Sequence, residues 1–90
     1  MQCLYPAIAE QDEAGYWLVR FPDVPEASTD AETLEDALAE AQDALLAGLG
    51  GYIEQRRDIP APSPVGPGQH GVELPVLTSA KLALYRAMRD

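Results

Sequence analysis

The order of hydrophobic patterns along this chain predicts an α+β fold with the element order β-β-β-α-β-α. Short apolar segments rich in aromatic and β-branched residues come first, separated by turn residues, as the strands of a sheet require. A long stripe of apolar residues at steps of three and four follows, which is typical of a helix packed on a sheet. Ninety residues with 47% hydrophobic content suffice for one hydrophobic core and argue against disorder.

Three strands are predicted at the start of the chain, and we expect them to form an antiparallel sheet. The second strand places Trp17, Val19 and Phe21 on one face, and this all-apolar face should point to the core. After it, Pro22 and Pro25 fix their own φ angles and bias the residues before them to extended geometry. This pattern predicts a stiff loop rather than a tight hairpin. The three strands are predicted over residues 4–10, 16–21 and 27–30.

A long helix is predicted from Thr33, whose hydroxyl can cap the first turn, to about Gln55. Gly48, Gly50 and Gly51 each weaken a helix by up to about 1 kcal/mol relative to alanine, but the apolar stripe keeps its phase beyond them. The stripe consists of Leu34, Leu38, Ala41, Leu45, Leu49, Tyr52 and Ile53. The predicted core combines the strand face with this stripe and contains Trp17, Val19, Phe21, Leu38, Ala41, Leu45 and Leu49.

The last third of the chain is predicted to hold a loop, a strand and a helix. Residues 58–71 are rich in proline and glycine, which indicates an exposed loop. A fourth strand over residues 72–77 should return beside the first through a right-handed strand–helix–strand connection. Thr78 or Ser79 then caps a helix that still runs where the sequence stops. The predicted division is a domain over residues 1–77 and a C-terminal helix over residues 78–90.

Acidic residues dominate the first 55 positions, which carry twelve acids and a single base, Arg20. The whole chain has a formal net charge of −9. Such a body repels nucleic-acid phosphates and attracts basic proteins, although acids also serve plain solubility. The lone cysteine, Cys3, cannot form an intramolecular disulfide and is predicted to be a small buried hydrophobe. Because the sequence shows neither a signal peptide nor a membrane span, we expect a cytoplasmic protein.

Residue patterns that support catalysis are weak. His70 is the only histidine, so a zinc site of the usual type cannot be assembled, and no glycine-rich phosphate loop occurs. Three strands followed by a helix and a strand also begin the ribonuclease H fold, in which carboxylates on the sheet hold two metal ions. Here Glu10 stands at the end of the first strand, with Glu35 and Asp36 near the helix start. We predict no enzyme activity, cofactor or metal, and a metal-dependent nuclease is the weaker alternative.

Residues 15–37 carry a compact order of signals that resembles the HicB antitoxin family. The family pattern G-Y-x-V-x-F-P-D-x-P-G/E is similar to GYWLVRFPDVPE over residues 15–26, and its T-L-E-E-A-L is similar to TLEDAL over residues 33–38. Glu26 stands where the family often has glycine. Weaker matches extend the resemblance over essentially the whole chain, including the proline loop and SAKLALY over residues 79–85.

The resemblance implies a partial, degenerate ribonuclease H-like domain without nuclease activity. It also implies a partner of the HicA type, a small basic messenger-RNA interferase whose catalytic histidine the antitoxin masks. Many family members add a C-terminal helix-turn-helix or ribbon-helix-helix domain that binds promoter DNA. We expect that domain to be missing here, in a naturally short member or a truncated chain, and so expect no DNA binding by these 90 residues alone.

The acidic body and the resemblance together predict an antitoxin that neutralises a HicA-like toxin. The alternative is a stand-alone homo-oligomeric interaction module or a small-ligand-binding module. A small basic protein encoded in the neighbouring reading frame would favour the antitoxin. Toxin-binding residues are expected in the two polar connections that flank the second strand and beneath them, namely Asp12, Glu13, Trp17, Phe21, Asp23 and Glu26.

Self-association of the chain is also expected. The last strand and helix are strongly apolar beside a small core, and such a surface usually needs a cover. The residues concerned are Leu74, Val76, Leu77, Leu82, Leu84 and Tyr85.

Overall fold

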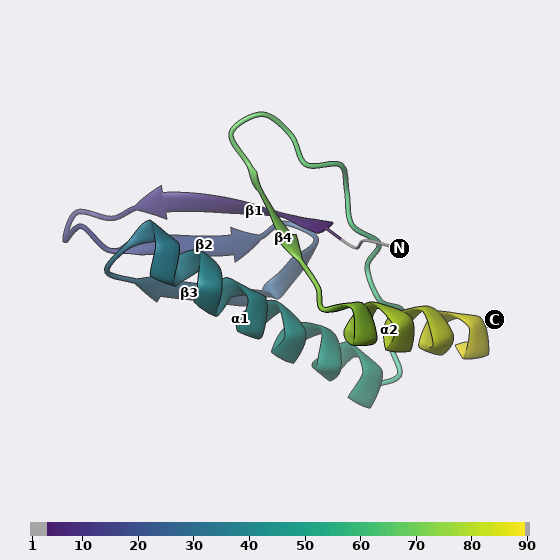
Figure 1. The fold of residues 1–90 in the computed structure, drawn as a ribbon. Coiled ribbons are helices and arrows are strands. Elements are labelled where there is room, and N and C mark those ends of the chain that lie inside the picture. The colour runs from purple at the N-terminus through teal and green to yellow at the C-terminus, as the bar shows by residue number, and fades with distance from the viewer. Residues whose placement is uncertain (1–3, 90) are drawn as a thin grey trace.

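The computed structural model of the chain describes residues 4–89, and its element order is the β-β-β-α-β-α predicted from the sequence (Figure 1). Cys3 lies outside the described residues, so its burial stays a prediction. The elements are β1 (Leu4–Gln11), β2 (Trp17–Phe21), β3 (Val24–Ala31), α1 (Leu34–Glu54), β4 (His70–Glu73) and α2 (Val76–Arg89).

The four strands form one antiparallel sheet in the order β3-β2-β1-β4. β1 changes partner along its length, because Leu4 to Ala7 pair with β4 whereas Ile8 to Gln11 pair with β2. The fourth strand therefore returns beside the first, as predicted. It runs antiparallel to β1, however, so the expected right-handed connection, which is a rule for parallel strands, does not apply.

The connection between β2 and β3 is a tight turn, and the prediction of a stiff loop is wrong. Only Pro22 and Asp23 separate the two strands, and Phe21 pairs with Val24 across the turn. Proline fits the second position of a four-residue turn because its φ is already set. Pro25 is tolerated within β3 because that strand is at the edge of the sheet. The pairing register between β2 and β3 shifts at this point, because Phe21 pairs with Val24 whereas Arg20 pairs with Ser28.

Helix α1 lies along one face of the sheet, as the apolar stripe predicted (Figure 1). The Thr33 hydroxyl accepts a hydrogen bond of 3.1 Å from the backbone N–H of Asp36, so the predicted cap is confirmed. Trp17 and Leu38, which are predicted to be core, are only partly buried, because Trp17 is the first residue of β2 and Leu38 lies in the first two turns of α1. The buried cluster contains Tyr5, Ala7, Val19, Phe21, Val24, Ala27, Ala37, Ala41, Leu45, Leu49, Tyr52, Ile59, Val72, Leu74 and Leu82.

The C-terminal elements begin earlier than predicted. β4 spans His70–Glu73, and α2 starts at Val76, so neither Thr78 nor Ser79 caps it. Pro75 accounts for the difference, because it ends the strand and its carbonyl accepts the N–H of Ser79 at 2.9 Å to open the first helical turn. The side chain of Ser79 is buried, and its hydroxyl has no hydrogen-bond partner among the described residues.

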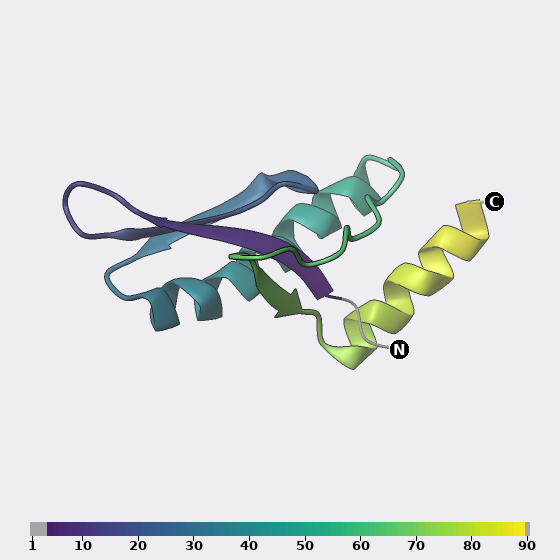
Figure 2. The ribbon, with the colours of Figure 1, turned by 90° about the horizontal axis from the view of Figure 1, so that it is seen from above.

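The β1–β2 hairpin and α2 lie at opposite ends of an elongated molecule of about 45 × 25 × 19 Å (Figure 2). Leu82 packs into the core, and the Tyr85 hydroxyl donates a hydrogen bond of 3.1 Å to the carbonyl of Arg57. These contacts fasten α2 to the loop that follows α1. None of the described helices is long and apolar enough to cross a membrane.

Candidate functional site

The residues predicted to bind a toxin lie at the two ends of β2 and do not form one surface. Asp12 and Glu13 belong to the β1–β2 hairpin, whereas Asp23 and Glu26 lie at the β2–β3 turn and in β3. Five residues of β2 separate the two ends, about 17 Å at the usual rise of a strand. The aromatic residues follow the same division, with half-buried Trp17 at the hairpin end and fully buried Phe21 at the turn end.

The hairpin end is closed by its own residues. The Asp12 carboxylate accepts a hydrogen bond of 2.8 Å from the N–H of Tyr16, and the backbone N–H of Asp12 donates to the carbonyl of Tyr16 at 2.8 Å. Gly15 adopts a φ of 91°, in the region that favours glycine, and its N–H bonds the carbonyl of Asp12 at 3.1 Å. Glu13 is exposed at the tip. One carboxylate therefore shapes the turn, and the other faces solvent.

The turn end is tied to a segment far away in the sequence. Asp23 accepts hydrogen bonds from the backbone N–H of Ser63 at 2.7 Å and from its hydroxyl at 2.8 Å. Ser63 lies in the proline-rich loop between α1 and β4. This carboxylate therefore anchors a loop that forms neither a helix nor a strand.

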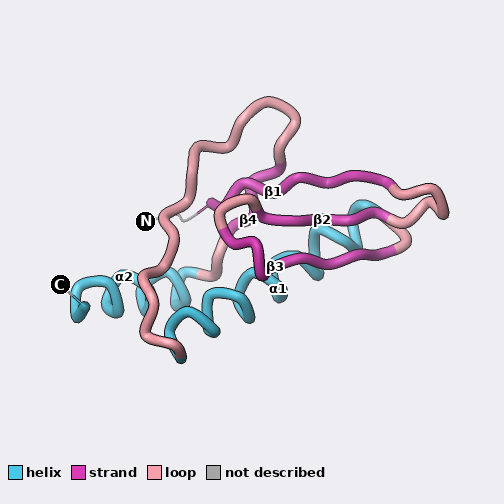
Figure 3. Tube along the Cα trace, turned by 180° about the vertical axis from the view of Figure 1, so that it is seen from behind, coloured by secondary structure: helices cyan, strands magenta, loops and turns pink. Residues whose placement is uncertain are grey.

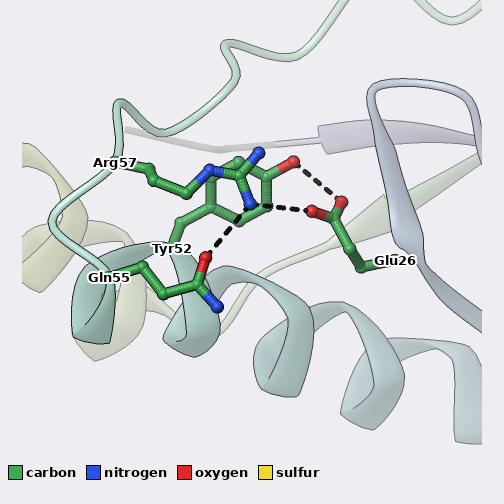
Figure 4. A network of polar contacts seen from close by, with 4 residues as sticks. All are labelled: Glu26, Tyr52, Gln55 and Arg57. Atoms are coloured by element: carbon green, nitrogen blue, oxygen red, sulfur yellow. Dashed lines mark hydrogen bonds and ion pairs between the residues drawn. The ribbon is translucent and has the colours of Figure 1, made fainter.

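Glu26 is held by two residues from the end of α1 and the loop after it (Figure 4). The Tyr52 hydroxyl donates to one carboxylate oxygen at 2.8 Å, and the Arg57 guanidinium donates to the other at 3.1 Å. The guanidinium also lies over the Tyr52 ring, 4.2 Å from its centroid, and donates to the Gln55 side-chain carbonyl at 3.2 Å. Glu26, Tyr52, Gln55 and Arg57 thus form one hydrogen-bonded cluster, the Glu26 group, in which only the guanidinium stacks on the ring.

These contacts shift two pKa values in opposite directions. The hydrogen bond from Tyr52, with further help from Glu26's own backbone and from Arg57, lowers the pKa of the Glu26 carboxyl below its ordinary value of 4.5. The same hydrogen bond and burial raise the pKa of the Tyr52 hydroxyl above 10.0. Glu26 is therefore a firmly ionised carboxylate at neutral pH.

The Glu26 group closes one end of a shallow groove of about 420 Å³ between β3 and α1. Small residues of α1, including Ala44, Ala47, Gly48 and Gly51, form its helix side. At Gly48 a Cβ atom would stand 3.3 Å from side-chain atoms of Val24 and Ala27, so this glycine lets the helix approach β3 closely. The groove is thus lined by backbone and methyl groups, with a charged group at its end.

Charge is distributed unevenly between the two ends of the molecule. The hairpin, the end of β3 and the first turn of α1 meet at one end (Figure 1). Their acids are Asp12, Glu13, Asp30, Glu32, Glu35 and Asp36. The bases Arg56, Arg57, Lys81 and Arg86 lie in the loop after α1 and in α2, at the other end.

Within residues 4–89 no group of three or more His, Cys, Asp or Glu side chains is arranged to hold a metal ion. Glu10, the strand-end acid on which a nuclease would depend, is in an exposed ion pair with Arg20 at 2.9 Å. The hydrogen bonds of Glu26 with Tyr52 and Arg57 were not predicted, because these two partners lie 26 and 31 residues further along the chain. No local pattern marks such a contact.

The four-stranded antiparallel sheet backed by one long helix is the architecture of a domain found in antitoxins of bacterial toxin–antitoxin systems. The chain belongs to the HicB-like antitoxin family, described as "HicB_like antitoxin of bacterial toxin-antitoxin system", which it matches over residues 4–83. The resemblance of residues 15–37 to HicB is thereby confirmed.

Individual relatives agree with this assignment. The chain is 49% identical over 84 residues to Antitoxin HicB 2 of Photorhabdus laumondii, a match that covers 93% of this chain and 58% of the relative. It is 37% identical over 83 residues to Antitoxin HicB of Escherichia coli K12, covering 92% of this chain and 60% of the relative. The chain therefore spans less than two thirds of the length of these relatives.

A solved structure shows the same fold. The N-terminal domain of Burkholderia pseudomallei antitoxin HicB superposes with a TM-score of 0.58 at 20% sequence identity. The superposition covers 84% of this chain and 98% of that domain. At this identity the likeness supports the fold, while the family rests on the sequence matches.

Proposed function

We propose that this chain neutralises a small basic messenger-RNA interferase of the HicA type by binding over its active site, as a cytoplasmic binding protein without enzyme activity. Membership of the HicB-like antitoxin family supports the antitoxin role. The observation that favours a basic partner is the acidic end of the molecule, where the hairpin, the end of β3 and the first turn of α1 bring six acids together. Such a field speeds encounter with a basic protein and disfavours RNA.

The two ends of β2 would have different roles in this binding. Asp12 and Glu13, in a hairpin closed by its own bonds, can attract the toxin without any cost to the fold. Asp23 and Glu26 are engaged in hydrogen bonds within the chain, so they would present a rigid, preformed surface. Trp17 and Phe21 support the two ends from the sheet.

Co-expression tests the proposed function. The reading frame next to this chain's gene should encode a small basic protein, and its induction alone should arrest growth. Induction together with this chain should restore growth, and the two proteins should elute together on size-exclusion chromatography. Persistent growth arrest with both proteins soluble would contradict the antitoxin role and favour a stand-alone interaction or ligand-binding module.

We also propose that copies of the chain associate through α2. Of the residues expected to drive self-association, Leu74 and Leu82 are buried within the chain, and the side chains of Val76 and Leu77 lie outside the description. Leu84 is 62% exposed, and Met88, one turn further, is 77% exposed. Light scattering across a wide concentration range should therefore show dimers or larger species, whereas a constant 9.7 kDa species would contradict this proposal.

A further inference from the structure

The outer edge of β3 is open on the described part of the chain. β3 is the last strand of the sheet on that side, next to β2 and beside α1 (Figure 3). An edge strand presents backbone N–H and C=O groups that can pair with another strand. At eight residues β3 is long enough for a substantial ladder.

Two hollows lie near this edge, one between β3 and α1 and one over the paired strands β2 and β3. On the α1 side lies the groove of about 420 Å³ that ends at the Glu26 group. On the opposite face a second hollow of about 420 Å³ lies over Leu18 and Arg20 of β2 and Asp30 of β3. Both hollows include Ser28, in the middle of β3. Successive side chains of an added strand point to opposite faces, so every second side chain would face the groove beside α1 and the others would face the side of Leu18 and Arg20.

Charge selects the kind of strand that fits. β3 carries Glu26 and Asp30 and no base. The arginines that line the two hollows are each paired with an acid, Arg57 with Glu26 and Arg20 with Glu10, so Asp30 is the acid of β3 that no arginine of the described residues neutralises. On the helix side, Glu40 approaches β3 through a hydrogen bond of 3.4 Å from the Thr29 hydroxyl, and Asp43 follows one turn later. Antiparallel pairing of β3 with a second copy would set carboxylates against carboxylates, which is destabilising. A strand with lysine or arginine beside small apolar residues is complementary instead.

We infer that the β3 edge is the docking line for an extended basic strand of the toxin, which adds to the sheet as a fifth strand and places every second side chain in the groove beside α1. This inference rests on the proposed antitoxin function. In such binding the backbone hydrogen bonds give affinity for any extended strand, whereas the side chains that enter the groove give specificity for one partner. The Glu26 group closes one end of the groove and limits how far the added strand can extend, because Tyr52 and Arg57 hold the Glu26 carboxylate in place.

Two neighbouring glycines of α1 give a matched pair of test variants. A Cβ at Gly50 or at Gly51 meets no atom within 4 Å, so a side chain can leave the helix at either site without a clash at its first atom. Gly51 lines the groove, whereas Gly50 does not. Gly51→Leu should fill the groove, and Gly50→Leu places the same side chain on the same helix away from it. Both variants should melt no lower than the parent chain, because leucine favours a helix more than glycine does.

The experiment is a calorimetric titration of the purified toxin encoded by the neighbouring reading frame, once with the parent chain and once with each variant. Gly51→Leu should weaken binding about tenfold or more, and Gly50→Leu by less than about twofold. Hydrogen exchange of the parent complex should show slowed amides within residues 24–31.

Equal affinity of the parent chain and Gly51→Leu, or unchanged exchange in β3, overturns the inference and leaves the antitoxin role intact. A parent chain that does not bind the toxin overturns the proposed function itself. If Gly51→Leu instead disrupts a dimer of this chain, the occupant is a second copy and the inference is wrong.

Discussion

The two ends of β2 carry similar acidic residues that do different work. At the hairpin end, Asp12 bonds only within its own turn, to Tyr16 and Gly15. At the turn end, Asp23 bonds Ser63, 40 residues away, and Glu26 bonds Tyr52 and Arg57. Acidic residues next to a strand can therefore either close a local turn, as Asp12 does, or connect distant segments, as Asp23 and Glu26 do. Substitutions can separate these two roles.

Removing the aromatic residue at each end should give the largest and most unequal effects. Phe21 is 1% exposed, so Phe21→Ala should reduce the free energy of unfolding by about 3–5 kcal/mol. Trp17 is only partly buried, and Trp17→Ala should cost less than about 3 kcal/mol. Denaturation by urea measures both. An equal or larger loss at Trp17 would mean that the hairpin end is packed as tightly as the turn end.

A glycine substitution tests whether the hairpin end is shaped by its own backbone. At Gly15, with φ of 91°, Gly15→Ala should destabilise the fold by about 1–2 kcal/mol, because a Cβ is strained in that region. Gly50→Ala in α1 is the control, and it should instead stabilise by up to about 1 kcal/mol. Thermal melting of the two variants should thus shift in opposite directions. A Gly15→Ala variant as stable as the parent would contradict the turn geometry.

The turn end should show a smaller effect that depends on pH. The pKa of Glu26 is lowered in the fold, so its bond with Tyr52 stabilises the protein above pH 4.5 and is lost as the pH falls through the folded value. The pKa of Tyr52 is raised, so the contribution is also lost above pH 10.0. Tyr52→Phe should therefore melt lower than the parent at neutral pH, and the difference should shrink as the pH falls below 4.5. A constant difference over that range would mean that the hydrogen bond does not stabilise the fold.

The hairpin end should affect binding rather than stability. Asp12→Lys with Glu13→Lys alters exposed positions, and we expect association with the toxin to slow about tenfold at low salt and far less at high salt. Stopped-flow measurements at two salt concentrations can establish this. Loss of the turn bond to Tyr16 should leave the melting temperature within a few degrees. An association rate that does not depend on salt would mean that the hairpin end does not contribute to toxin binding.

The same comparison explains how much could be predicted from the sequence. The cap at Thr33, the stripe through Leu45 and Leu49, and the inward face of Val19 and Phe21 depend on spacing alone, and all were predicted correctly. Turn chemistry was less certain, because Pro22 suits a tight turn as well as a stiff loop. The start of α2 was misplaced for a similar reason, since proline can end a strand or open a helix.

The candidate site was only partly predictable. The acidic positions at both ends of β2 could be identified as polar connections, but their partners could not. The bond of Glu26 to Tyr52 depends on how α1 lies against β3, and the bond of Asp23 to Ser63 depends on the path of an irregular loop. Neither leaves a local sequence signal. The groove is likewise a product of tertiary packing, because Gly48 and Gly51 read only as weak points of a helix.

The most direct test of the central claim is inhibition of RNA cleavage by the neighbouring-frame toxin. The toxin is incubated with a labelled messenger RNA while this 90-residue chain is added in increasing amounts, with the heat-unfolded Phe21→Ala variant as the control. Cleavage should fall in proportion to the added chain and stop when toxin and chain reach a fixed ratio, whereas the unfolded control should have no effect. Cleavage that continues undiminished at a large excess of folded chain would mean that this chain does not neutralise the toxin.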